Sequence, residues 1–267
     1  MSPAPSLETV LTAEADGVLT LTLNRPDVLN AVNDQLTLEL GEALKYAERE
    51  RTVRCLVLTG AGRGFCSGQD LRDRAGVGVE SPVSYGDSLR RRYNPIIQRL
   101  AGIEKPVIAA VNGVAAGAGC NLTLAADLRV ASDRASFIEV FARVGLIPDS
   151  GGTYFLPRLV GLAKAFELAY LADPVDAAEA LRIGLVNRVV PHEELMPAAL
   201  DWARRLAAGP TKGHGLTKRG LRRAASSTLE EALAYEAYLQ EIAGGTADHR
   251  EGVAAFLEKR KPNFTGS

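Results

Sequence analysis

The sequence lacks the features by which membrane, secreted and nucleic-acid-binding proteins are usually recognised. None of its apolar runs approaches the roughly 20 residues that a helix needs to cross a bilayer. Its start, MSPAPSLETV, has no basic stretch followed by a long apolar one, so we expect no secretory signal. Lys and Arg number 31 against 32 Asp and Glu, a balance that gives no broad attraction to nucleic acid or anionic lipid. We expect a soluble protein that binds neither.

Cysteine is also scarce. Cys55, Cys66 and Cys120 form no CxxC pair, and an odd number of cysteines cannot all pair within one chain. We therefore predict three reduced thiols and a cytoplasmic location.

Metal ligands and nucleophilic serines lack their usual spacing. The three histidines, His192, His214 and His249, lie far apart, so we expect no metal site. Ser67 and Ser150 lie near glycines but outside a GxSxG elbow, which argues against a serine acyl-hydrolase.

What the sequence does contain is a succession of short apolar strands and amphipathic helices. Asn33 is a good N-cap for a helix over Asp34–Glu50, and a second helical pattern covers Asp87–Leu100. The polar stretch Arg72–Gly86 between them is typical of a loop. Strands are predicted at Val18–Leu23, Cys55–Leu58, Val107–Val111, Leu128–Ala131, Phe137–Val140 and Val186–Val190. We expect an α/β core over residues 1–200 and a C-terminal helical region over 201–267.

Two of these strands lead into glycine-rich turns. Gly60, Gly62, Gly64 and Gly68 follow the first, and three more glycines occur in NGVAAGAG after the second. Glycine lets a backbone approach a ligand closely and present N–H donors. Neither turn continues into Gly-Lys-Ser/Thr, and neither gives a clean GxGxxG that opens a helix. Taken alone, the glycines favour tight turns and close packing over a binding loop.

The residues around the glycines carry a more specific signal. In order along the chain stand LTLNRPDVLNAVN, LTGAGRGFCSGQDL, PVIAAVNGVAAGAGCNLTLAAD, GLIPDSGGTYFLPRLVG and EGVAAFLEKRKPNF. Together they resemble the crotonase (enoyl-CoA hydratase/isomerase) superfamily over nearly the whole chain. The resemblance implies a spiral of ββα units with a C-terminal helical trimerisation region, and trimers that often pair into hexamers. It also implies an acyl-CoA substrate and no separate cofactor, because coenzyme A is part of the substrate.

The resemblance further implies an oxyanion hole built from two backbone N–H groups. By motif position these belong to Gln69, in GQDL, and Ala118, in GAG, with Gly68 and Gly117 before them. Removing a proton beside a thioester carbonyl puts negative charge on its oxygen. Two fixed N–H dipoles stabilise that charge, and one good donor contributes about 2.7–4 kcal/mol.

The acid/base group departs from the pattern of the hydratases in this superfamily. They carry two glutamates, and here Asn121 and Phe141 occupy those places, so ordinary hydration is not expected. The nearby Asp149 is predicted to be a single shared acid and base, with Phe141 as part of an apolar wall. Two alternatives stay open: Asp149 could cap the next helix, and Glu139 could be the catalytic carboxylate. Alternation along the predicted strand would place Glu139 and Phe141 on one face.

Coenzyme A requires partners for its phosphates and adenine. By resemblance, Arg25 in LNRP lies near the nucleotide, and Phe256 and Lys259 form a C-terminal contact that a neighbouring subunit often supplies. Arg25 and Lys259 could equally be ordinary surface charges. Asp70 follows the oxyanion residue and is expected chiefly to fix its loop by hydrogen bonds to backbone.

Within the superfamily, several segments are similar to isomerases that act on ring-1,2-epoxyphenylacetyl-CoA. These segments are GRGFCSGQDL, RRRYNPIIQRL, GLIPDSGGT and DHREGVAAFLEKRKPNF. The resemblance implies conversion of an aromatic-ring epoxide thioester to an oxepin, and movement of double bonds in unsaturated acyl-CoAs. The alternatives are a hydratase or thioester hydrolase of the same superfamily, and a non-catalytic RNA-binding member, which the balanced charge disfavours.

Overall fold

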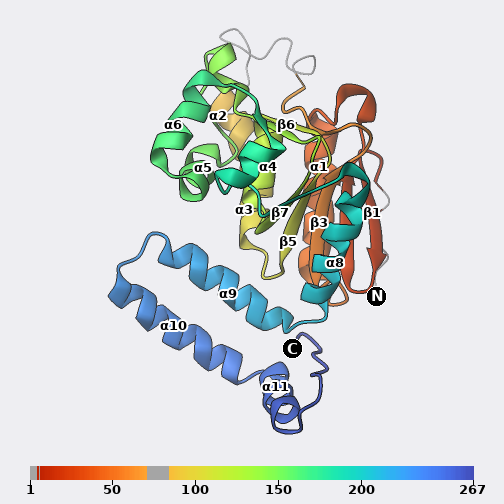
Figure 1. Ribbon diagram of the computed structural model, residues 1–267, viewed down its shortest axis with the longest axis vertical. Helices are drawn as coiled ribbons and strands as arrows, with labels where there is room; N and C mark the ends of the chain where they lie inside the picture. The colour runs from red at the N-terminus through yellow and green to blue at the C-terminus, as the bar shows by residue number, and fades with distance from the viewer. Residues whose placement is uncertain (1–4, 6, 71–83) are drawn as a thin grey trace.

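Two sheets, a layer of helices and a helical arm make up the described part of the chain (Figure 1). The computed structural model describes residues 5, 7–70 and 84–267. The larger sheet has the strand order β1 (Val10–Ala15), β2 (Val18–Leu23), β3 (Cys55–Gly60), β5 (Val107–Val111), β7 (Leu128–Ser132) and β10 (Arg188–Val190). The smaller sheet has the order β4 (Gly64–Cys66), β6 (Val114–Ala116), β8 (Ser136–Ile138) and β9 (Val175–Asp176).

The chain winds through these sheets as a spiral. Each of the pairs β3–β4, β5–β6 and β7–β8 gives its first strand to the larger sheet and its second to the smaller one. Neighbouring turns pair in parallel in both sheets, β3 with β5 and β7, and β4 with β6 and β8. A helix follows the strand pair in each turn. The predicted spiral of ββα units is therefore confirmed.

Helices cover both faces of the larger sheet. The helices of the core are α1 (Asp34–Arg49), α2 (Tyr85–Ser88), α3 (Asn94–Gly102), α4 (Ala118–Ala125), α5 (Gly152–Val160), α6 (Leu162–Leu171), α7 (Ala177–Arg182) and α8 (Leu195–Ala207). On one face, α1 buries Leu36, Leu40 and Leu44 in the main hydrophobic cluster. On the other, α8 packs Ala199, Ala203 and Ala207, spaced one turn apart, against a second cluster.

The last helices form an arm that extends from this core. They are α9 (Thr211–Ala224), α10 (Leu229–Gly244) and α11 (Ala247–Leu257), and Figure 1 shows them reaching away from the sheets. The boundary expected at residue 200 falls inside α8, whose later residues still pack on the sheet, and the arm begins at Thr211. Arg54 holds its first residues, because its side chain donates to Gly209 O at 2.6 Å and Thr211 Oγ1 at 2.8 Å.

Several predicted elements differ from the structure in detail. The strand predicted to Val140 ends at Ile138, because Val140–Val144 forms a 3₁₀ helix. The helix predicted over Asp87–Leu100 contains a π-helical turn at Leu89–Tyr93. Most of the expected loop lies outside the described residues, and its last two residues begin α2.

Two expectations from composition can be compared with the structure. Each of the three cysteines is a buried free thiol. Among the helices of residues 5, 7–70 and 84–267, none is long and apolar enough to cross a membrane.

Candidate active site

The two glycine-rich segments touch each other through their backbones. A Cβ added at Gly119 would lie 2.2 Å from the carbonyl oxygen of Cys66, and one added at Gly68 would lie 2.8 Å from that of Ala116. Gly68 also has a φ of +92°, a conformation that favours glycine. A side chain at either position would force the segments apart. The glycines therefore serve close packing, and the packing sets the spacing of the neighbouring amides.

The amides of Gln69 and Ala118 are the two N–H groups predicted for the oxyanion hole. Val32 N donates to Gly68 O at 2.7 Å and Asp70 N to Val32 O at 2.9 Å, so strand alternation turns the Gln69 N–H away from Val32. Ala118 is the first residue of α4, where an N–H has no acceptor within the helix. Within the described residues neither amide donates a hydrogen bond.

The side chain of Gln69 has a structural task. The Tyr93 hydroxyl donates to Gln69 Oε1, and Gln69 Nε2 donates to Val32 O at 3.2 Å. Because both ends of the amide are engaged, the residue can serve a ligand through its main chain, as expected.

Asp149 lies in the turn before α5, beside the start of α4. The Asp149 side chain is half-buried, and its Oδ1 accepts a hydrogen bond from Ser150 Oγ at 2.8 Å. The N-cap of α5 is Gly151, so Asp149 does not occupy the capping position that was an alternative for it. Asn121 Nδ2 and Gly152 N both donate to the Asp149 carbonyl, at 2.9 and 2.7 Å. Two donors on one carbonyl fix the peptide that carries this carboxylate.

Asn121 and Phe141, the residues at the two hydratase positions, both lie against the oxyanion segment. Asn121 is fully buried in α4, and a Cβ on Gly152 would lie 2.6 Å from its Nδ2. Phe141 is buried, and its ring would lie 3.7 Å from a Cβ on Gly117. The Phe141 ring thus lies beside Gly117, and its role as an apolar wall of the site stays a prediction. The expected strand alternation with Glu139 is wrong, because Phe141 belongs to the 3₁₀ helix.

Glu139 is buried between β8 and that 3₁₀ helix, with 3% of its surface exposed. Burial raises its pKa to about 7, and the charge of Asp149 adds to the rise. The Cys120 thiol and the Asn121 amide lie close enough to lower the pKa in part, yet neither makes a hydrogen bond of ordinary geometry with the carboxylate. Sequence spacing named Glu139 as a candidate but gave no sign that it would be buried.

Arg25 and Asp70 form an ion pair at 3.0 Å, in which both side chains are largely buried. Arg25 Nη1 also donates to Ala31 O, so the guanidinium ties the LNRP turn to the oxyanion loop. Asp70 is thus tied to Arg25 through its side chain and to Val32 O through its own N–H, and the predicted hydrogen bonds from its carboxylate to backbone stay a prediction. A contact between Arg25 and a nucleotide stays a prediction.

Phe256 and Lys259 lie at the end of the arm, and Phe256 is 82% exposed. Figure 1 shows α11 at the opposite end of the molecule from α4 and α5. One chain therefore does not bring these residues to the oxyanion segments, and their contact with a neighbouring subunit's ligand stays a prediction.

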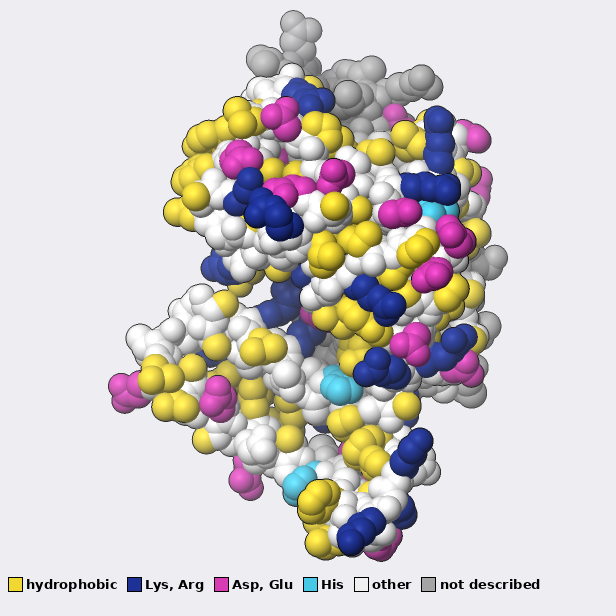
Figure 2. Space-filling model, viewed as in Figure 1, with side chains coloured by type: hydrophobic (Ala, Val, Ile, Leu, Met, Phe, Trp, Pro, Cys, Tyr) yellow, Lys and Arg dark blue, Asp and Glu magenta, His cyan; other side chains and the backbone are white. Residues whose placement is uncertain are grey.

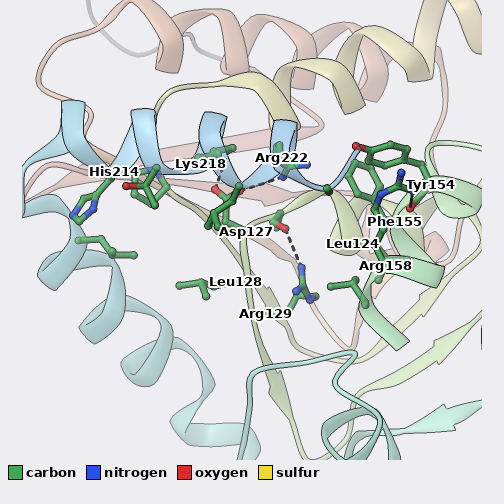
Figure 3. Close-up of a pocket in the computed structure, with 17 residues that line it drawn as sticks. Leu124, Asp127, Leu128, Arg129, Tyr154, Phe155, Arg158, His214, Lys218 and Arg222 are labelled. Atoms are coloured by element: carbon green, nitrogen blue, oxygen red, sulfur yellow. Dashed lines mark hydrogen bonds and ion pairs between the residues drawn. The ribbon is translucent and has the colours of Figure 1, made fainter. Parts of the chain in front are cut away.

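A hollow of about 650 Å³ lies between α9 and the core and was not predicted. Figure 2 shows this hollow between the helical arm and the core, with basic side chains within it. Lys218 and Arg222 project from α9 towards Asp127, at 2.9 and 3.2 Å (Figure 3). Arg129 donates instead to the carbonyls of Ala126 and Leu185. None of the predicted site residues lines this hollow, and its ion pairs hold the arm to the core.

The described residues contain no group of three His, Cys, Asp or Glu side chains that could hold a metal ion.

Comparison with known proteins places this site in context. A family model described as enoyl-CoA hydratase/isomerase matches residues 13–267. The chain is 49% identical to a 1,2-epoxyphenylacetyl-CoA isomerase of Escherichia coli (strain K12), over 97% of this chain and 99% of that one. It is 45% identical to a probable enoyl-CoA hydratase of Rhodobacter capsulatus, over 98% and 99%.

Solved structures are similar along the same length. The crystal structure of a putative enoyl-CoA hydratase from Streptomyces coelicolor A3(2) matches with a TM-score of 0.92 and 40% identity, over 100% of this chain and 98% of that one. A putative enoyl-CoA hydratase/isomerase from Mycobacterium abscessus matches with a TM-score of 0.92 and 39% identity, over 97% and 100%.

Proposed function

Because this chain belongs to the enoyl-CoA hydratase/isomerase family, we propose that it is an acyl-CoA isomerase. We propose ring-1,2-epoxyphenylacetyl-CoA as its substrate and the oxepin thioester as its product, with movement of double bonds in unsaturated acyl-CoAs as a related activity. The relative at 49% identity, which carries the isomerase name, supports the substrate class.

The observation that carries the proposal is that Asn121 and Phe141 stand at the hydratase glutamate positions, while Asp149 lies in the turn held by Asn121 of α4, the helix that begins at Ala118. Hydration requires one group to activate water and another to deliver a proton. Asn121 is fully buried with its amide on the Asp149 carbonyl, and Phe141 is apolar, so neither of the hydratase positions supplies a proton. Moving a proton between two atoms of one substrate needs only one such group, and we assign that role to Asp149.

The proposed reaction follows from these positions. The thioester oxygen accepts hydrogen bonds from the N–H groups of Gln69 and Ala118. Asp149 removes a proton from the carbon next to the thioester, and the electron pair moves onto the oxygen held by those donors. In the epoxide, the carbon–carbon bond shared by the three- and six-membered rings then breaks to give the seven-membered ring, and the proton returns at a ring carbon. In an unsaturated acyl-CoA the charge spreads along the conjugated chain, and the proton returns at another carbon. Substrate and product contain the same atoms, and the reaction needs no cofactor beyond the coenzyme A of the substrate.

Asp149→Asn tests this assignment. Asparagine keeps the size of the side chain but cannot carry the proton, so we expect turnover to fall by at least about 10²-fold, the lower end of general acid–base contributions. Binding of the CoA thioester should be retained. Asp201→Asn, a change at an exposed aspartate of α8, is the matched control and should leave activity unchanged. Full turnover in Asp149→Asn would refute the role of this residue.

A hydratase is the second candidate, favoured by the relative at 45% identity that is named a probable enoyl-CoA hydratase. The two reactions differ by one molecule of water. An isomerase incorporates no solvent oxygen, whereas a hydratase or thioester hydrolase does. Mass spectrometry of products formed in heavy-oxygen water, from epoxyphenylacetyl-CoA, unsaturated acyl-CoAs and crotonyl-CoA, distinguishes them.

We also propose that the chain works as a homo-oligomer, a trimer or a dimer of trimers, in the cytoplasm. The arm supports this proposal, because it exposes large apolar side chains to water and such surfaces mark contacts with other proteins. These side chains are Leu229, Leu233, Tyr238, Phe256 and Leu257. Sedimentation would measure the assembly. A gel shift with unrelated RNA at physiological salt should be blank, as expected for a protein without a basic stripe.

A further inference from the structure

A small polar cluster lies buried behind the Asp149 turn. It consists of Glu139, Cys120 and Asn121, and both Cys120 and Asn121 belong to the first turns of α4. Three of its oxygens are buried without a hydrogen-bond partner: Oε1 and Oε2 of Glu139, and Oδ1 of Asn121. Buried oxygens without a donor are costly and therefore call for a physical explanation.

A bound water would have little room here. Glu139 borders a hollow of about 10 Å³, the lower limit of the roughly 10–15 Å³ that a water needs together with two or more polar partners. Most of the lining is apolar, including Phe137, Leu156 and Leu168. A proton on Glu139 is the simpler answer, because it turns one of three acceptors into the donor that another one lacks.

We propose that Glu139 is a positioning residue, protonated in the working enzyme, that donates to Asn121 Oδ1 and so holds the Asn121 amide on the Asp149 carbonyl. This inference rests on the proposed role of Asp149 and adds to it. The amide bond from Asn121 Nδ2 to Asp149 O, at 2.9 Å, is the link through which Glu139 would act. Glu139 touches no substrate in this scheme and exchanges no proton with it.

The charges around Glu139 favour its neutral form. The titratable groups that face it are the Cys120 thiol from α4, Asp149 from the turn before α5, and Asp173 from the segment after α6. None of the side chains that line the hollow is a cation. Arg143, from the neighbouring 3₁₀ helix, donates its guanidinium to Ala172 O. Burial, together with the charge of Asp149, accordingly raises the pKa of Glu139 to about 7.

The sign of the pH dependence follows. Below the raised pKa, Glu139 carries the proton and the link to Asp149 is complete. As pH rises through about 7, the carboxyl ionises, three acceptors again lack a donor, and a second negative charge faces Asp149. We expect kcat to fall along this alkaline limb by about tenfold, the change that one hydrogen bond of ordinary strength would cause. KM should change little.

Glu139→Gln and Glu139→Leu form the test, measured as kcat and KM against pH with the isomerised thioester as product. Glutamine keeps a donor at every pH, so Glu139→Gln should retain the kcat that the wild-type protein has at acid pH and lose the alkaline limb. Leucine has no donor, so Glu139→Leu should have a kcat about tenfold lower at all pH values, without an alkaline limb. Thermal melting establishes that each variant is folded.

The results that would overturn the proposal are distinct from those that would overturn the proposed function. An alkaline limb unchanged in Glu139→Gln would assign it to another group. A folded Glu139→Gln without activity at any pH would make the glutamate itself the base. Equal kcat in the glutamine and leucine variants would show that no donor is needed. Asp149→Asn decides the proposed function separately, whichever of these occurs.

Discussion

Gly119→Ala would measure how strictly the oxyanion amides depend on the contact between the two glycine segments. The new Cβ would lie 2.2 Å from the carbonyl oxygen of Cys66 and 2.7 Å from its Cβ, where ordinary contacts begin at 3.4 Å. Since both opposing groups are close to the backbone, relief requires the segments to separate by about 1 Å. Displacement of a catalytic group by ~1 Å costs on the order of 10²-fold in rate.

The assay is kcat/KM for the acyl-CoA substrate together with thermal melting. We expect a loss of about 10²-fold in kcat/KM and a loss of stability of about 1–3 kcal/mol from overpacking. Gly41→Ala is the control, because this glycine also lies in a helix, α1, and nothing stands within 4 Å of its added Cβ. It should gain about 0.5–1 kcal/mol of stability and keep its activity. A folded Gly119→Ala with wild-type kcat would refute the argument that this contact sets the amide spacing.

Two further predictions concern stability. Asp127→Ala removes the carboxylate that pairs with Lys218, whose side chain is 8% exposed, and should lower the free energy of unfolding in urea by about 3 kcal/mol. Asp201→Ala, the control in an exposed ion pair, should lower it by less than about 0.5 kcal/mol. Equal losses in the two variants would contradict the reasoning. Glu39 accepts from the N–H groups of Glu8, Thr9 and Val10, and although burial acts to raise its pKa, these bonds and that from the Thr9 hydroxyl lower it below the ordinary 4.5. Their contribution is present above the ordinary pKa and is lost as pH falls through the folded one, so Glu39→Gln should destabilise by about 1 kcal/mol at neutral pH and by less in acid; a loss that is the same at both pH values would exclude the carboxylate as the cause.

The fold could be predicted from the sequence where local pattern and long-range pairing agree. The alternating residues of β2 and the apolar run of β5 gave strands with the observed bounds, and Asn33 caps α1 with its side chain on Leu36 N as expected. The two oxyanion segments were found through resemblance, since glycine content alone fits close packing equally well. The structure shows the close packing of these residues, and donation to a ligand by the same segments stays a prediction.

Other features depend on contacts that no local pattern contains. The strands β4 and β6 have three residues each, too few for a period to be visible, and their pairing exists because the spiral brings them together. At the hollow between α9 and the core, Asp127 forms an ion pair with Lys218, although the two residues are distant in sequence. The state of Glu139 depends on burial by α4, α5 and α6, so its charge could not be judged from its neighbours in the chain.

The three buried thiols have a consequence for a protein that handles an epoxide. Strained electrophiles alkylate thiolates, and a thiol becomes a nucleophile only when it ionises. Burial raises the pKa of Cys55 and of Cys66 to about 12, and that of Cys120 well above its ordinary value. Cys66 and Cys120 each stand two residues from a glycine or amide of the oxyanion segments, yet at neutral pH both stay protonated. The proposed substrate would therefore be held beside two sulfur atoms without meeting a reactive one, which protects the enzyme from modification by its own reactant.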